Sequence, residues 1–126
     1  MKKFFKKALV STMAIATMAV SVGEMNVSAG DATVAFSPAA TATLYRGNTT
    51  VSASTKCTAY SYVITAKITS TTGGTITSGN TVQSIYNVEN ATANATGYGT
   101  GFTSASSYHY VSTSEYGSGT KNLTVY

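Results

Sequence analysis

The chain has no tryptophan, one proline, one cysteine, one histidine and four acidic residues among its 126 positions. A lone cysteine has no partner for an intrachain disulfide, so a fold held together by disulfides is excluded. Zinc sites take three or four His, Cys or carboxylate ligands, and calcium sites take clustered carboxylates. The few candidate ligands lie far apart in this sequence. We therefore expect no metal site and no cofactor.

The shortage of titratable groups also argues against an enzyme, because acid–base catalysis depends on such groups. The sequence has no GxSxG motif, which marks a nucleophilic serine elbow. The glycines of GYGTGF, residues 97–102, lack the GxGxxG spacing that opens a nucleotide-binding helix. We interpret that segment as a strand or loop where another backbone approaches closely or a ring lies over it. We expect no enzyme and no catalytic residue.

The first 29 residues have the layout of a secretory signal peptide. A lysine cluster precedes an uncharged apolar run of 15 residues at 8–22, and Val27 and Ala29 fit positions −3 and −1 of a cleavage site. A transmembrane anchor is the alternative, but a membrane span needs about 20 apolar residues. We predict a helical signal peptide at 1–29 that is cleaved. The product is then a secreted bacterial protein whose only membrane contact is through the uncleaved signal.

Removal of the signal peptide changes the charge of the chain. The whole sequence has a net charge of +4, whereas the predicted mature chain, residues 30–126, has four basic and three acidic residues and a net charge of +1. These residues are Arg46, Lys56, Lys67 and Lys121 against Asp31, Glu89 and Glu115. No basic patch remains to hold a polyanionic backbone, so we expect no nucleic-acid binding.

Helix-forming runs are scarce in the mature chain, whereas β-branched and aromatic residues are abundant. In the clearest strand, 57–69, alternation predicts one buried face and one largely solvated face. The residues predicted to share one face are Tyr60, Tyr62, Ile64, Ala66 and Ile68, and those predicted to share the other are Ala59, Ser61, Val63, Thr65, Lys67 and Thr69. The other predicted strands are 32–37, 41–45, 48–55, 92–98, 102–112 and 120–126, with further strand in 75–88 around a turn or bulge at 78–80. The pattern predicts one all-β domain at 30–126, a small antiparallel β-sandwich or small barrel of about seven to eight strands.

Cys57 is the only cysteine of the chain. We expect it to be a small buried residue, which is the usual state of a lone cysteine. The alternatives are an interchain disulfide and a reactive thiol. Without a disulfide of its own, the domain must be stabilised by its core and by the hydrogen bonds between its strands.

The segment SYHYVSTSEYGSG, residues 107–119, contains the only histidine and three of the nine tyrosines. Strand alternation places Tyr108 and Tyr110 on one face and His109 on the other. We expect the two tyrosines to point inward and His109 to be satisfied by a neighbour. Tyrosines in a sheet protein without tryptophan are expected mainly to fill the core, and the alternative is a row of exposed rings that stack on sugars or peptides. The candidate ligand-binding residues are Tyr98, Tyr108, His109, Tyr110 and Tyr116.

In size, signal and composition the chain resembles small secreted β-sandwich proteins of Gram-positive bacteria, including some bacteriocins. No specific motif accompanies this resemblance, so no residue role can be transferred. We expect a secreted, non-enzymatic binding or surface-interaction domain whose partner is an extracellular protein or glycan. The alternatives are a secreted antimicrobial, bacteriocin-like or toxin-like protein, and a small hydrolase that uses His109.

Overall fold

The computed structural model describes residues 24–27 and 30–126, with side chains for the second range only. Residues 1–23 and 28–29 lie outside the described part, and with them most of the predicted helical signal peptide and its cleavage site. Within the described part there is no helix, and so none that is long and apolar enough to cross a membrane.

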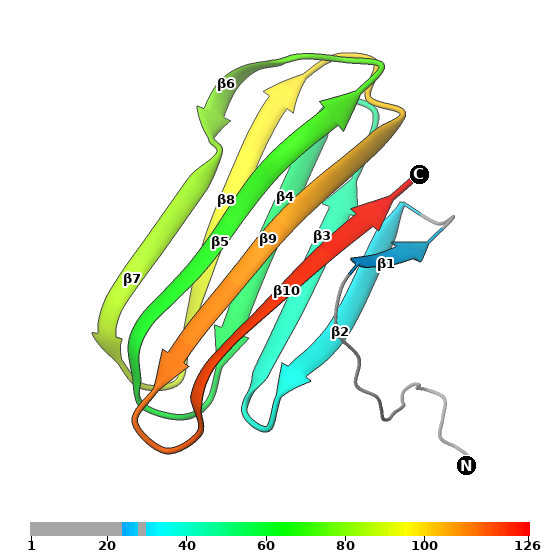
Figure 1. Cartoon of the computed structure of the whole chain (residues 1–126). Helices are drawn as coiled ribbons and strands as arrows, with labels where there is room; N and C mark the ends of the chain where they lie inside the picture. Colours follow the sequence, from blue (N-terminus) through cyan, green and yellow to red (C-terminus); the bar gives the residue numbers. More distant parts are fainter. Residues whose placement is uncertain (1–23, 28–29) are drawn as a thin grey trace.

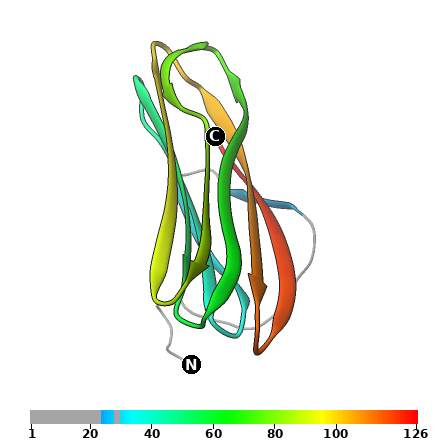
Figure 2. The ribbon, with the colours of Figure 1, turned by 90° about the vertical axis from the view of Figure 1, so that its left-hand side faces the viewer.

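The described chain forms two β-sheets that pack face to face, as Figures 1 and 2 show. We call the sheet nearer the viewer in Figure 1 the front sheet and the other the rear sheet. The front sheet has the strand order β1 (Glu24–Val27), β10 (Gly117–Val125), β9 (Ser104–Thr113), β5 (Ser61–Thr72) and β7 (Val82–Val88). The rear sheet has the order β2 (Asp31–Ser37), β3 (Ala40–Arg46), β4 (Thr50–Cys57), β8 (Ala91–Gly99) and β6 (Ile76–Asn80).

Every neighbouring pair of strands is antiparallel except β1 and β10, which run parallel. The expected all-β, antiparallel architecture is therefore confirmed. The short strand β1 falls inside the predicted signal peptide and pairs only with Asn122–Val125 of β10. Both sheets are otherwise built from residues 31–125.

The described chain has nine strands between Asp31 and Val125, more than the sequence predicted. The difference arises in the segment 75–88, which forms two strands in two different sheets. β6 pairs with β8 in the rear sheet, and β7 pairs with β5 in the front sheet. Gly79 has a φ of +108°, a backbone conformation that suits glycine, and the chain then passes between the sheets at Thr81. The backbone N–H of Ile68 donates to the carbonyl of Thr81 at 2.8 Å and holds this crossing in place.

The core between the sheets is made of small and branched aliphatic side chains. The rear sheet contributes mainly alanines, such as Ala42 and Ala53, and the front sheet contributes larger residues, such as Ile64 and Leu123. Small side chains on one face leave room for large ones on the other, so the two layers can interdigitate. The buried apolar residues are Ala32, Ala40, Ala42, Leu44, Val51, Ala53, Cys57, Ile64, Ala66, Ile68, Ala93, Ala95, Phe102, Ala105, Val111, Leu123 and Val125.

A β-bulge near the start of β5 corrects the predicted face of two tyrosines. Ile64, Ala66 and Ile68 are buried, as the alternation predicted. The register of β5 against β9, however, shifts between Ser61 and Val63. A bulge adds one residue and so breaks the two-residue period. Ser61 therefore lies in the core, whereas Tyr60 and Tyr62 are exposed, and the prediction that these tyrosines share a face with Ile64 is wrong.

The glycines of segment 97–102 lie at the end of β8, beside β6, and in the loop that follows β8. A Cβ on Gly99 would run into the carbonyl oxygen of Thr75 and into the ring of Phe102, and one on Gly97 would meet the side chain of Ile76. The expectation of a close backbone approach with a ring lying over it is confirmed.

Candidate functional site: a face of tyrosines

The tyrosines of this protein lie outside its core. All nine fall within the described residues, and none belongs to the buried set. Seven of them are 42% to 64% exposed, and Tyr108 and Tyr110 are half-buried. The expectation that tyrosines mainly fill the core is therefore wrong. The interior between the sheets is already filled by alanine and aliphatic side chains, and a tyrosine outside it keeps its hydroxyl in contact with water.

The direction predicted for Tyr108 and Tyr110 is also corrected. Along β9 the side chains alternate strictly, and His109 points into the core. Tyr108 and Tyr110 consequently point to the outer side of the front sheet. Alternation correctly separated His109 from its neighbours, but it could not show which face the second sheet covers.

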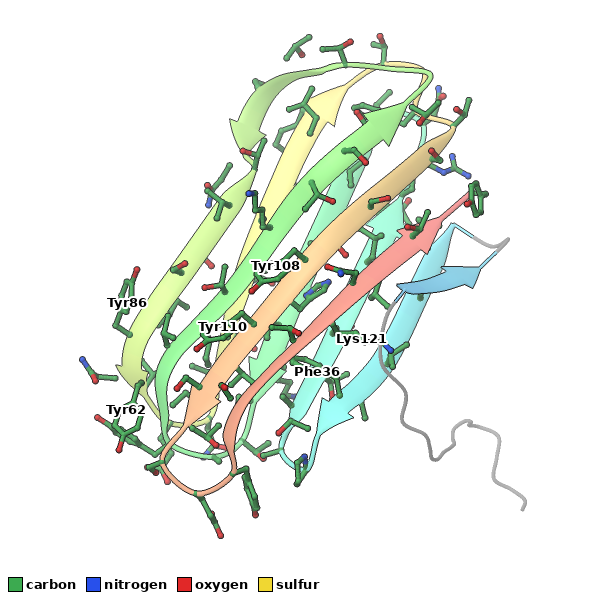
Figure 3. All side chains as sticks on the ribbon, in the orientation of Figure 1. Phe36, Tyr62, Tyr86, Tyr108, Tyr110 and Lys121 are labelled. Atoms are coloured by element: carbon green, nitrogen blue, oxygen red, sulfur yellow. The ribbon has the colours of Figure 1, made fainter. Side chains whose placement is uncertain are left out.

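The outer side of the front sheet carries three tyrosines on two strands, β7 and β9, with β5 between them. Tyr86 comes from β7, and Tyr108 and Tyr110 come from β9, as Figure 3 shows. Register places Val63 of β5 opposite Tyr86, and Lys67 of β5 opposite Tyr108. We call the surface formed by Val63, Lys67, Tyr86, Tyr108 and Tyr110 the tyrosine face.

Polar side chains lie between the rings of the tyrosine face. Tyr110 lies between Thr65 of β5 and Thr120 of β10, and Tyr108 has Asn122 of β10 on its other side. The hydroxyl of Thr65 is 2.9 Å from that of Ser84 on β7, so neighbouring strands share hydrogen bonds across the surface. The tyrosine face therefore combines aromatic rings with hydroxyl and amide groups.

A second pair of rings flanks the tyrosine face where β5 begins. Tyr60 and Tyr62 make an edge-to-face contact, with ring centroids 5.9 Å apart and an interplanar angle of 83°. This arrangement places the positive edge of one ring against the negative face of the other. Tyr62 directly precedes Val63, and Figure 3 shows it on the same side of the molecule as Tyr86. Sequence reasoning missed Tyr62 and Tyr86 as candidates, because only strand register brings them to this surface.

The charge of the tyrosine face is positive and small. Strands β5, β7, β9 and β10 contain no aspartate and no glutamate. Of their two lysines, Lys67 is exposed on the outer side and Lys121 is buried on the inner side. Lys67 is therefore the only charged side chain that these four strands present on the tyrosine face.

His109 is the centre of a hydrogen-bonded chain inside the core. Thr55 of β4 donates its hydroxyl to the carbonyl of Thr65 at 2.7 Å, and the same oxygen is 2.9 Å from Nδ1 of His109. Since that hydroxyl proton is already used, Nδ1–H donates to Thr55, and Nε2 accepts from the Ser107 hydroxyl at 2.7 Å. A neutral imidazole satisfies both contacts. The expectation that a neighbour satisfies the hydrogen bonding of His109 is confirmed. The contact with Thr55 links the front sheet to the rear sheet.

Burial keeps this imidazole neutral. Desolvation lowers the pKa of His109 to about 4, against a smaller opposing effect of a backbone hydrogen bond at Ser54. Lys121, its cross-strand neighbour on β10, is 3% exposed, and burial lowers the pKa of its ammonium group as well.

This geometry argues against the hydrolase hypothesis. A serine hydroxyl bonded to a histidine is an arrangement used in nucleophilic catalysis. Ser107 and His109, however, are 1% and 0% exposed, so a substrate cannot reach either group. The ring nitrogens of His109 contact Thr55 and Ser107 rather than Cys57 or Glu115.

The remaining candidates are dispersed. Tyr98 is exposed on β8 of the rear sheet, and Tyr116 is exposed in the turn between β9 and β10. That turn is organised by Thr113, whose hydroxyl oxygen accepts from the N–H of Tyr116 at 2.8 Å and donates to the carbonyl of Gly117 at 3.0 Å. Of the five candidates, only Tyr108 and Tyr110 share a surface.

Cys57 is buried at the end of β4, as expected, and its thiol lies 3.6 Å from the carbonyl oxygen of Ala59. An interchain disulfide would require this end of the strand to open. Among the described residues there is no group of three or more His, Cys, Asp or Glu side chains that could hold a metal ion. No family model, no curated protein and no solved structure matches this chain.

Proposed function

We propose that this chain is a secreted, non-enzymatic binding domain that contacts an extracellular ligand through its tyrosine face. The observation that carries the proposal is the placement of all nine tyrosines outside the core, with Tyr86, Tyr108 and Tyr110 on one side of one sheet. The signal-like N-terminus supports secretion.

Tyrosine suits a recognition surface for two physical reasons. Its ring offers a large contact area and loses little conformational entropy on binding, because it has only two rotatable side-chain bonds. Its hydroxyl tolerates water before binding and can form a hydrogen bond afterwards, so the side chain is favoured where one end is dry and the other is wet. The strand register of the sheet sets the spacing of the rings before any ligand binds.

The test is a binding screen with the full chain against arrays of extracellular proteins and glycans. We expect a ligand whose affinity falls about tenfold or more when Tyr108 or Tyr110 is replaced by alanine, because truncating a central aromatic residue usually costs more than 1 kcal/mol. Tyr45→Ala is the control, since Tyr45 is an exposed tyrosine of the rear sheet, away from the tyrosine face. No ligand on broad arrays, or equal losses in all three variants, would contradict the proposal.

The antimicrobial alternative is measured with the same preparations. Purified protein is spotted on lawns of Gram-positive bacteria at micromolar concentration. Growth inhibition that persists in the Tyr108→Ala and Tyr110→Ala variants would favour that alternative over the binding function proposed above.

A further inference from the structure

We propose that the ligand of the tyrosine face is an acidic glycan, a polysaccharide whose sugar rings stack on Tyr108 and Tyr110 and whose carboxylate groups meet Lys67. This inference rests on the proposed binding function and names its ligand class. It follows from the spacing of the rings, from the polar groups between them and from the charge of the surface.

The spacing of the rings suits an extended ligand. Tyr108 and Tyr110 are two residues apart on β9, which places their Cα atoms about 7 Å apart along the strand. Tyr86 lies two strands away, roughly 10 Å across the sheet. Rings distributed over such a distance on an exposed sheet face offer several separate stacking positions. A chain of repeated units can use all of them, whereas one small molecule can use only one.

The polar groups between the rings favour a sugar over a protein partner. A pyranose ring has an apolar C–H face, which can lie on an aromatic ring, and a rim of hydroxyls that must be hydrogen-bonded. Around Tyr108 and Tyr110 the surface provides such partners in Thr65, Thr120 and Asn122. The dry centre of a protein interface is richer in apolar residues. Around the tyrosine face the apolar aliphatic residues are Val63, which lies opposite Tyr86, and Val82, which lies opposite Lys67.

The charge of the surface favours an acidic sugar. Lys67 is exposed and stands opposite Tyr108, and none of the four strands that form the surface carries a carboxylate. β1 adds one carboxylate to the front sheet, Glu24 of the predicted signal peptide, opposite Asn122 and on the far side of Tyr108 from Lys67. A carboxylate on a sugar stacked at Tyr108 would meet the Lys67 ammonium on the β5 side of that ring. Because a single ion pair is formed, we expect binding to weaken only modestly as the salt concentration rises.

The test is native affinity electrophoresis of the full chain in gels that contain a soluble polyuronate. The probes are polygalacturonate, alginate and hyaluronate, together with polygalacturonate whose carboxyl groups have been reduced to alcohols. We expect retardation by at least one acidic polymer and weaker retardation by the reduced one. Tyr108→Ala and Tyr110→Ala should each lower the affinity about tenfold. Lys67→Gln should lower the affinity for the acidic polymer several-fold and leave the affinity for the reduced polymer unchanged.

Tyr45→Ala is the control and should bind the acidic polymer with the same affinity as the wild-type protein. Far-ultraviolet circular dichroism and a urea unfolding midpoint verify that each variant is folded. Failure of every acidic polymer to bind, or equal binding of the acidic and reduced polymers with no effect of Lys67→Gln, overturns this inference. If a protein ligand from the array screen still depends on Tyr108 and Tyr110, the proposed function survives. If no ligand of any class is found, both fail.

Discussion

His109 shows how one residue can connect the two sheets of a small domain. Its imidazole accepts a hydrogen bond from Ser107 on its own strand and donates one to Thr55 on the opposite sheet. The Thr55 hydroxyl in turn donates to the backbone carbonyl of Thr65 on β5. Buried polar groups are tolerated when all their hydrogen bonds are made. The same network makes the domain sensitive to any change that leaves one of these groups without its partner.

Acidification should destabilise the protein through His109. The pKa of His109 is lowered from 6.5 to about 4 by burial, so between these pH values the unfolded chain binds a proton that the folded chain does not. Stability therefore falls as the pH drops from about 6.5 to about 4, by up to roughly 3 kcal/mol, and this loss levels off below pH 4. The free energy of unfolding, measured with urea at a series of pH values, checks this prediction.

The control for this prediction is His109→Gln, which cannot titrate. Its stability at neutral pH is expected to be lower, but its stability should change less than that of the unchanged chain between pH 6.5 and 4. The carboxylates titrate in both proteins, so the difference between the two curves isolates His109. Parallel curves would show that the imidazole has no part in the pH dependence.

The hydroxyl of Thr55 should be worth more than that of a surface threonine. Thr55→Val preserves the shape of the side chain but leaves the Nδ1–H of His109 and the carbonyl of Thr65 without this partner. We expect a loss of about 1–3 kcal/mol of stability, the usual cost of a buried unsatisfied polar group. Thr43→Val, on the outer side of the rear sheet, should change stability by less than about 0.5 kcal/mol. Similar urea midpoints for the two variants would refute the network.

At the scale of elements, the loop between β5 and β6 packs closely against the end of β8 and the loop that follows it. Glycines make this close contact possible. A Cβ on Gly74 would run into the carbonyl oxygen of Thr100, and one on Gly99 into the carbonyl oxygen of Thr75. The backbones therefore lie closer than side chains would allow. This contact ties the end of the front sheet to the end of the rear sheet, beyond the core.

Gly99→Ala should therefore destabilise the fold by about 1–3 kcal/mol, because the added methyl group forces two backbones apart. Gly119→Ala is the control, since a Cβ there meets only atoms of Phe36 at 3.7 Å or more. That variant should unfold at the same urea concentration as the unchanged chain, or slightly higher. Equal midpoints for the two variants would show that the loops can move apart at no cost.

At the scale of the whole molecule, removal of residues 1–29 should leave the two sheets in place. Residues 1–29 contribute only β1 to the described fold. This strand lies at one edge of the front sheet, where its four residues pair with four residues of β10. The core residues all come from position 32 onward. Cleavage and folding are therefore compatible.

Expression of the full sequence in a secreting bacterial host should yield a protein in the medium that begins at Gly30. Intact mass and N-terminal sequencing measure this directly. In Ala29→Phe the residue before the cut is no longer small, so we expect the precursor to stay with the cells. Release of a product that retains Met1, or equal processing of the two chains, would contradict the predicted signal peptide.

The sequence predicted the features that depend on local chemistry. The scarcity of helix formers, the period of two in β9 and the turn residues between strands correctly predicted that the chain described from Gly30 onward is all-β, with most of its strands. Close approach at Gly97 and Gly99 and the satisfied His109 were also predicted, because glycine in a strand and a polar residue on an apolar face each have few physical explanations. The strand pairing, the crossing at Thr81 and the bulge after Ser61 were not predictable, since they depend on partners distant in the sequence.

By itself, then, the sequence determined the class of fold and the separation of Tyr108 and Tyr110 from His109. Only the tertiary structure decided which side of β9 is the inside. Alternation is a property of a single strand, whereas burial depends on the second sheet that covers one of its faces. The rear sheet covers the side of β9 that carries His109, which contacts Thr55 of that sheet, and Tyr108 and Tyr110 therefore lie on the opposite, outer side.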